Sequence, residues 1–239
     1  MSNVFRPKSV FVAASAMLLA GAVAFAGVQT DKQLARVKKD RNGNVSFKQV
    51  AGYTGYETDN EYHAKIKELT DPQAIYELKM KHHQLNIEHE LNGGVLHGSI
   101  ERGGSLITID IVGTGTAAGF HHSLTFPAKF EVHSEPHDPS VEIDTFRTNM
   151  YRIEGAAGGD SLFSSLRLVG GTANGFASPG QMTLIDKGDS VLVDSFFNIG
   201  YRIEFTGADG GPLAGVQDSF EGTVTMRAHG TEQAVTGGK

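Results

Sequence analysis

The amino-acid sequence predicts a mainly β protein, either an antiparallel β-sandwich or a barrel-like domain, with a short helical or irregular N-terminal extension. Three observations predict this class. From about residue 92 to about residue 229, apolar and polar residues alternate with a period of two, the apolar positions favour β-branched and aromatic side chains, and glycine-rich turns separate the segments. Strands with one apolar and one polar face are typical of antiparallel sheets, whereas parallel α/β sheets bury both faces.

The N-terminal part of the chain, residues 27–90, carries most of the lysines and little of this alternation. Two of its segments, Asp31–Lys39 and Asn60–Lys81, have the pattern of short helices. Asp71 and Pro72 form a helix start signal in the second segment, because proline is favoured in the first helical turn. The apolar residues that follow at helical spacing are Ala74, Ile75 and Leu78. The sequence therefore predicts an N-terminal extension with short helices.

The predicted β domain spans residues 91–230. Its alternating segments are Ser105–Gly113, Phe126–His133, Val141–Asp144, Leu162–Leu168, Val191–Phe205 and Phe220–Met226. The predicted turns are Arg102-Gly103-Gly104, Gly170-Gly171, Ser178-Pro179-Gly180, Lys187-Gly188-Asp189 and Asp209-Gly210-Gly211-Pro212. In Val191–Phe205 every second residue is apolar or small, and the opposite face carries several polar residues. This segment is longer than the usual strand of about 5–6 residues, so we expect a bulge or bend at Gly200.

Residues 1–26 have the pattern of a signal peptide. Two cations near the start are followed by an uncharged apolar run at residues 10–24, and Ala24-Phe25-Ala26 matches the small-x-small cleavage pattern. We therefore expect export to the periplasm or the extracellular space, a mature chain that begins at Gly27, and no membrane span after processing. Residues 231–239 form a polar tail.

Composition and charge exclude several classes of function. The formal net charge of -6 provides no broad basic surface, so we expect no nucleic-acid partner. The chain has no cysteine, which excludes disulfides, thiolate metal sites and a thiol nucleophile. An exported domain without disulfides must be held together by packing alone.

The segment Val193–Phe205 (VDSFFNIGYRIEF), followed by Gly211–Gly215 (GPLAG), resembles a segment of uncharacterised secreted and surface-anchored bacterial proteins. In those proteins the pattern reads D-S-F-F-D-I-x-Y-x-I-x-F-x-G and then P-L-x-G. Two upstream stretches that also fit are Leu162–Leu166 and Ser178–Gly180. The resemblance covers about residues 140–228 and implies a secreted β-domain with no known activity. This chain differs at Asn198, where the pattern has Asp, and its polar tail replaces the hydrophobic anchor of some of those proteins.

A cluster of histidines and a carboxylate makes up the candidate metal site. In an extended chain His133, Glu135 and His137 project to the same side, and two imidazoles with one carboxylate are a ligand set for Zn, Cu, Ni or Fe(II). His121 and His122, one strand earlier, are further candidate ligands across a hairpin. A divalent transition metal is thus the one candidate cofactor. The alternative is a solvated surface turn, which the prolines within and after the cluster favour.

Other polar residues indicate no specific chemistry. His82-His83, His89 and His97 have the pattern of exposed residues or cross-strand partners. Lys38–Phe47 resembles part of a calcium-binding loop, but lysine and glutamine stand at its first and last ligand positions, so an Asn-Gly turn is the better interpretation. No G-x-S-x-G sequence flanks any serine, which leaves no predicted nucleophile.

Three hypotheses of function remain open. The leading one is an exported, non-catalytic β-sandwich with a structural, adhesive or assembly role at the cell surface or outside the cell, which includes self-association. The second is an exported metal-binding protein or metalloenzyme that uses His133, Glu135 and His137. The third is a soluble ligand-binding module with its pocket between the sheets, for which Phe196 is a candidate lining residue because it points away from the main apolar row.

Overall fold

The computed structural model describes residues 35–38, 53–58, 62–138 and 140–230. The predicted signal peptide, the polar tail and most of the Lys38–Phe47 turn lie outside these residues. Most of the described residues form strands joined by turns, with one short 3-10 helix, η1 (Thr172–Asn174). The strands are β1 (Ala35–Lys38), β2 (Tyr53–Thr58), β3 (Tyr62–Lys67), β4 (Ala74–Asn92), β5 (Ser99–Gly115), β6 (His121–Ser134), β7 (Ile143–Gly158), β8 (Phe163–Gly170), β9 (Pro179–Asp186), β10 (Ser190–Gly207) and β11 (Gln217–Gly230). The predicted mainly β class is confirmed.

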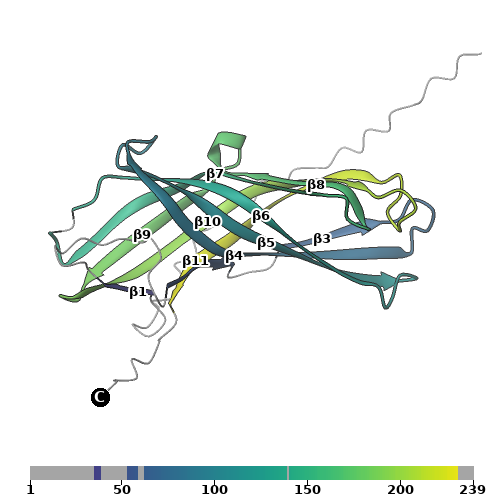
Figure 1. The fold of residues 1–239 in the computed structure, drawn as a ribbon, viewed down its shortest axis with the longest axis horizontal. Helices are drawn as coiled ribbons and strands as arrows, with labels where there is room; N and C mark the ends of the chain where they lie inside the picture. Colours follow the sequence, from purple (N-terminus) through teal and green to yellow (C-terminus); the bar gives the residue numbers. More distant parts are fainter. Residues whose placement is uncertain (1–34, 39–52, 59–61, 139, 231–239) are drawn as a thin grey trace, which may run out of the picture.

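All strand pairs are antiparallel and belong to one sheet with the order β2-β11-β10-β8-β7-β6-β5-β4-β3. Two short strands complete it: β1 pairs with β10, and β9 pairs with both β10 and β7. Figure 1 shows the twisted sheet wrapping along the long axis of the molecule, with β1 and β9 towards one end and β3 and β8 towards the other.

β2, at one end of this strand order, meets β4, the second strand from the other end, which makes the fold barrel-like. The backbone amide of His82 in β4 donates to Thr58 Oγ1 in β2 at 3.0 Å, and the Thr58 hydroxyl donates to the His82 carbonyl at 3.4 Å. Because β2 also pairs with β11, these bonds link the first and last parts of the sheet.

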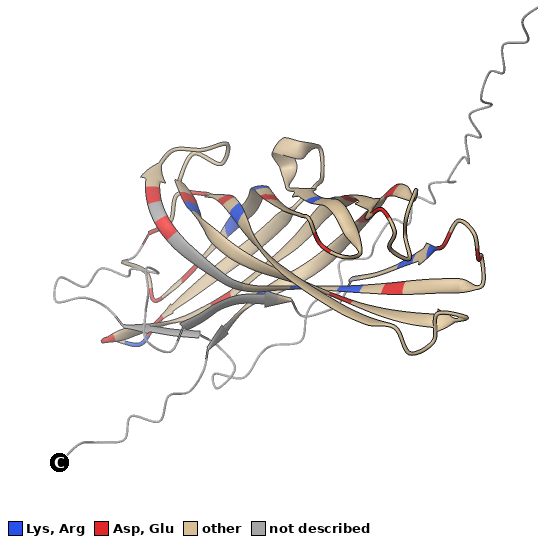
Figure 2. Ribbon diagram, turned by 45° about the vertical axis from the view of Figure 1, so that its right-hand side comes forward, with Lys and Arg blue, Asp and Glu red and all other residues tan. Residues whose placement is uncertain are grey.

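The alternation seen in the sequence separates an apolar interior from a polar exterior. In β5, Ile107, Ile109 and Ile111 are fully buried, while Thr108 and Asp110 lie on the outer face. Each such isoleucine contributes roughly 2 kcal/mol by burial. Figure 2 shows positively and negatively charged positions interspersed along the strands.

The helix predicted over residues 60–81 is wrong, because its described part forms β3, a turn and the start of β4. Ala74 and Leu78 are four residues apart, a spacing that places them on one face of a helix and equally on one face of a strand. Tyr76 decides between the two: it is buried between them in period two. In Asp31–Lys39 the described residues form β1. No helix of the described part is long and apolar enough to cross a membrane.

The predicted boundary at residue 90 and two details of the β domain are also corrected. β4 continues to Asn92 within the same sheet, so the described part of residues 53–90 belongs to the β fold. Arg102-Gly103-Gly104 is not a turn, because it lies inside β5 and pairs on both sides. The expected bulge at Gly200 is absent from the β10–β11 pairing, which keeps its register there. The register shift of β10 occurs instead at Thr206/Gly207 against β8.

Candidate functional site

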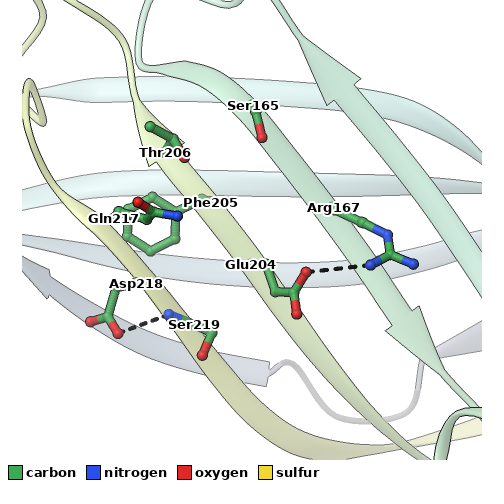
Figure 3. Close-up of a pocket in the computed structure, with 8 residues that line it drawn as sticks. All are labelled: Ser165, Arg167, Glu204, Phe205, Thr206, Gln217, Asp218 and Ser219. Carbon is green, nitrogen blue, oxygen red and sulfur yellow. Dashed lines mark hydrogen bonds and ion pairs between the residues drawn. The ribbon is translucent and has the colours of Figure 1, made fainter. Parts of the chain in front are cut away.

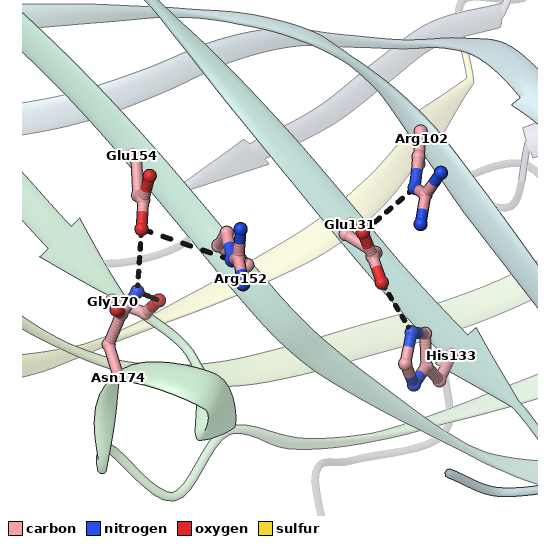
Figure 4. Close-up of polar contacts among 7 residues, drawn as sticks. All are labelled: Arg102, Glu131, His133, Arg152, Glu154, Gly170 and Asn174. Carbon is pink, nitrogen blue, oxygen red and sulfur yellow. Dashed lines mark hydrogen bonds and ion pairs between the residues drawn. The ribbon is translucent and has the colours of Figure 1, made fainter. Parts of the chain in front are cut away.

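The predicted metal ligand His133 is buried on the outer face of β6, beneath the tip of the β4–β5 hairpin. The backbone amide of Val95 in that tip donates to Nδ1 at 3.1 Å. Nδ1 is therefore an acceptor, and Nε2 carries the proton that is shared with Glu131 Oε1 at 2.8 Å (Figure 4). The ring also stacks on Tyr151, with 4.2 Å between centroids. Both nitrogens of His133 thus have partners, and Nδ1 holds the hairpin tip on the sheet.

The carboxyl group of Glu131 completes this contact. Its second oxygen accepts from Arg102 Nε at 2.8 Å, as Figure 4 shows. Burial raises the pKa of Glu131, but the hydrogen bonds from Arg102 and His133 outweigh it and hold that pKa below its usual value. The arrangement is an ion pair and hydrogen-bond network that joins β5, β6 and the hairpin.

The other two predicted ligands have different partners. Glu135 pairs with Arg147, accepting from Nη2, from Nε at 2.7 Å and from the backbone amide at 2.9 Å. The hydrogen bonds from this arginine lower the pKa of Glu135. His137 lies near Asp144, with 3.4 Å between Nδ1 and Oδ2, and stacks on the ring of Phe146.

His121 and His122, which were expected one strand before this cluster, instead begin the same strand as His133, β6, and lie at its opposite end. His121 is exposed, and His122 contacts both carboxylate oxygens of Asp160 at 2.9 and 3.0 Å. Asp160 in addition accepts from the backbone amides of Leu162 and Phe163, so that it caps the turn before β8.

The structure therefore does not gather the predicted ligands around one point. Within the described ranges, no group of three or more His, Asp or Glu side chains is arranged to hold a metal ion. Alternate residues share one face only while a strand continues, and β6 ends at Ser134, directly after residue 133. Beyond that residue each side chain turns to its own neighbour. Metal binding stays a prediction.

The polar residue that sequence reasoning missed is His82. It was predicted to be exposed or to pair across strands, yet it faces the interior from β4 and is 1% exposed. Neither ring nitrogen has a hydrogen-bond partner within the described part of the chain. Burial, with a smaller contribution from His83, lowers the pKa of His82 to about 4. The imidazole is therefore neutral at neutral pH, with one donor and one acceptor unused.

The interior changes from apolar to polar along β5. The fully buried isoleucines give way, on the same inner face, to Ser105, then Gly103, and then Glu101. Glu101 shares this face with buried Val132, its partner on β6, and lies opposite Glu90 on β4. Burial, assisted by the negative charge of Glu90, raises the pKa of Glu101 to about 7.

A second inward-facing polar side chain that has no hydrogen-bond partner among the described residues lies on β7. Thr148 of β7 is 3% exposed, shares its face with Phe146 and Met150, and its hydroxyl has no partner in the described ranges. Buried Ser195 of β10 lies on the inner face as well. Phe196, the predicted pocket residue, is on the outer face instead, where Arg227 covers its ring at 5.4 Å.

These two interior groups should give stability profiles of opposite slope. His82 is neutral in both the folded and the unfolded chain above pH 6.5, and because the folded chain resists its protonation, stability falls as pH drops from 6.5 towards about 4. The protonated Glu101 stabilises fully below pH 4.5, and this contribution is lost as pH rises towards about 7. The two effects therefore oppose each other between about pH 4.5 and 6.5.

We therefore expect Glu101→Gln to lose stability on acidification relative to the unmodified protein, and His82→Phe to lose it as pH rises. Urea unfolding at intervals from pH 4 to 8 measures both profiles. Parallel profiles for the two variants would contradict the placement of these groups in the interior.

A shallow groove of about 600 Å³ lies on the outer face of β8, β10 and β11. Figure 3 shows its polar lining, in which Arg167 Nη1 contacts Glu204 Oε2 at 3.5 Å. Asp218 accepts from the backbone amide of Ser219 at 2.8 Å. The groove is open, Arg167 and Glu204 pair with each other and Asp218 with a backbone amide, as on an ordinary solvated face, so we assign it no function.

The fold and the interior together define a barrel-like antiparallel β protein whose interior is apolar in one part and polar in another. No protein-family model matches the chain, and neither the curated proteins nor the solved structures include a significant match. The resemblance of Val193–Phe205 to secreted bacterial proteins therefore stays a prediction.

Proposed function

We propose that this protein is a ligand-binding module that holds a small, largely apolar molecule within its barrel-like sheet, next to His82. The observation that carries the proposal is the fully enclosed imidazole, whose two nitrogens have no partner in the described structure. This is the third of the hypotheses drawn from the sequence, with the site placed at residues other than Phe196.

The energetic argument is that an unpartnered imidazole destabilises a core. Burying a polar group without a hydrogen bond costs roughly 1–3 kcal/mol, and a leucine or phenylalanine at this position would avoid that cost. Buried groups of this kind call for a specific explanation. A ligand that offers a hydrogen bond to the imidazole would offset the cost and stabilise the bound state.

The position of His82 supports the same function. Barrel interiors are frequent ligand sites, lined by apolar side chains with a few polar groups that orient the ligand. Here the neighbours Met80 and Ile107 are fully buried and apolar, while the inner face beyond them carries the small residues Ser105 and Gly103.

Native mass spectrometry and titration with a fluorescent apolar probe test this proposal. We expect either a co-purified small molecule or saturable binding of one probe per chain, and His82→Phe should change the affinity. His121→Ala is the matched control because it alters an exposed histidine of the outer face and should leave binding unchanged. Non-saturable probe binding with no co-purified molecule would contradict the proposal. The structural, adhesive and metal-binding hypotheses would then regain priority.

A further inference from the structure

We infer that the molecule bound next to His82 is uncharged and mostly apolar, and that it carries at least one hydroxyl or carbonyl group that hydrogen-bonds to the imidazole. This inference rests on the proposed function and specifies the chemical class of the ligand.

The neutral imidazole determines which groups can satisfy it. One ring nitrogen donates a hydrogen bond and the other accepts one. A hydroxyl group can pair with either nitrogen and a carbonyl group with the donor. An alkane can pair with neither, so the polar group is needed to remove the cost of the unpaired nitrogens.

The surroundings disfavour a charged ligand. The buried polar side chains that the structure describes are histidine, serine and threonine, which bring no fixed positive charge into the interior. They are His82, Ser105, His133, Ser134, Thr148, Ser178, Ser190 and Ser195. A buried carboxylate would lose its hydration without gaining a cation in return.

The approach to the interior disfavours an anion as well. Glu90 and Glu101 face each other across β4 and β5, on the side of His82 away from the isoleucine core. The chain as a whole carries a formal net charge of -6. A carboxylate or phosphate that reaches His82 along β5 would pass this acidic pair, whereas a neutral molecule meets no electrostatic barrier.

A matched ligand series tests the inference: an alkanol, the alkanoate and the alkane of equal chain length, each used at pH 8 to displace the fluorescent probe. We expect the alkanol to bind about tenfold more tightly than either of the others, since one buried hydrogen bond is of that order. His82→Phe should abolish the preference for the alkanol over the alkane. If this variant fails to fold, the order of the three ligands' affinities for the unmodified protein still tests the inference.

The outcomes separate the inference from the proposed function. Equal binding of all three ligands, or tightest binding of the alkanoate, would overturn the inference and leave a ligand-binding module standing. An unchanged preference for the alkanol in a folded His82→Phe variant would do the same, because another group would then recognise the hydroxyl. Failure of all three ligands to displace the probe, together with non-saturable probe binding, would overturn both.

Discussion

Replacing Phe197 with aspartate is expected to abolish stable folding. Phe197 lies on the inner face of β10, is 1% exposed, and pairs with Met226 of β11. The packing around it is close: a Cβ atom at Gly180 would lie only 2.6 Å from its ring. An aspartate here places an unpaired charge in an apolar core, which costs at least several kcal/mol and is comparable to the whole stability of a domain.

The control for this variant is Glu204→Gln, seven residues along the same strand but on the outer face. Glu204 contacts Arg167 at 3.5 Å and Arg202 at 3.6 Å, and its side chain is 39% exposed. Exposed ion pairs of this kind contribute about 1 kcal/mol or less. Circular dichroism and urea unfolding measure both variants. Equal tolerance of the two changes would show that the inner and outer faces of β10 are assigned wrongly.

The second large effect is expected for Gly207→Ala at the end of β10. A Cβ atom on Gly207 would lie 1.7 Å from the carbonyl oxygen of Leu213 and 2.4 Å from its carbonyl carbon, which are backbone atoms. The Gly207 amide also donates to the Val216 carbonyl at 2.8 Å. The loop between β10 and β11 would have to move away, and with it the fully buried side chain of Leu213.

We expect Gly207→Ala to lower the free energy of unfolding by about 3 kcal/mol or more, because overpacking is combined with partial loss of a core leucine. The matched control is Gly104→Ala in β5. The nearest atom to its added methyl group is Glu88 Oε1 at 3.5 Å, an ordinary contact. Its effect should stay within about 0.5 kcal/mol. Urea unfolding measures the free energy of unfolding of both variants. A nearly unchanged value for Gly207→Ala would contradict the close approach of Leu213.

Local periodicity predicted the rows that build the core of the β domain. The inward rows of β5 and β10 are those that alternation predicts in Ser105–Gly113 and Val191–Phe205. Periodicity gave wrong predictions where the helical and strand spacings coincide, as at Ala74 and Leu78, and where glycines lie inside a strand. Gly103 and Gly104 continue β5 because both neighbouring strands supply backbone partners, which a turn signal read from one segment does not reveal.

The candidate site depended on contacts between residues distant in the sequence. His133, Glu135 and His137 follow one another at intervals of two residues, and this spacing alone predicts that their side chains lie together. Their actual partners include Val95, 38 positions away from His133, and Arg147, 12 positions away from Glu135. Such partners form only when hairpins meet, so no pattern within one strand predicts them.

The sequence by itself determined the mainly β class and the faces of the long strands, because both follow from a period of two that each strand carries within itself. The tertiary structure alone decided that β2 returns to β4 and that the hairpin tip covers His133. It also decided that the His82 ring faces the interior, where its nitrogens have no hydrogen-bond partner in the described part of the chain. The physical reason is that burial and hydrogen bonding depend on which strands become neighbours. That choice is made by the closing of the whole sheet and not by any one of its segments.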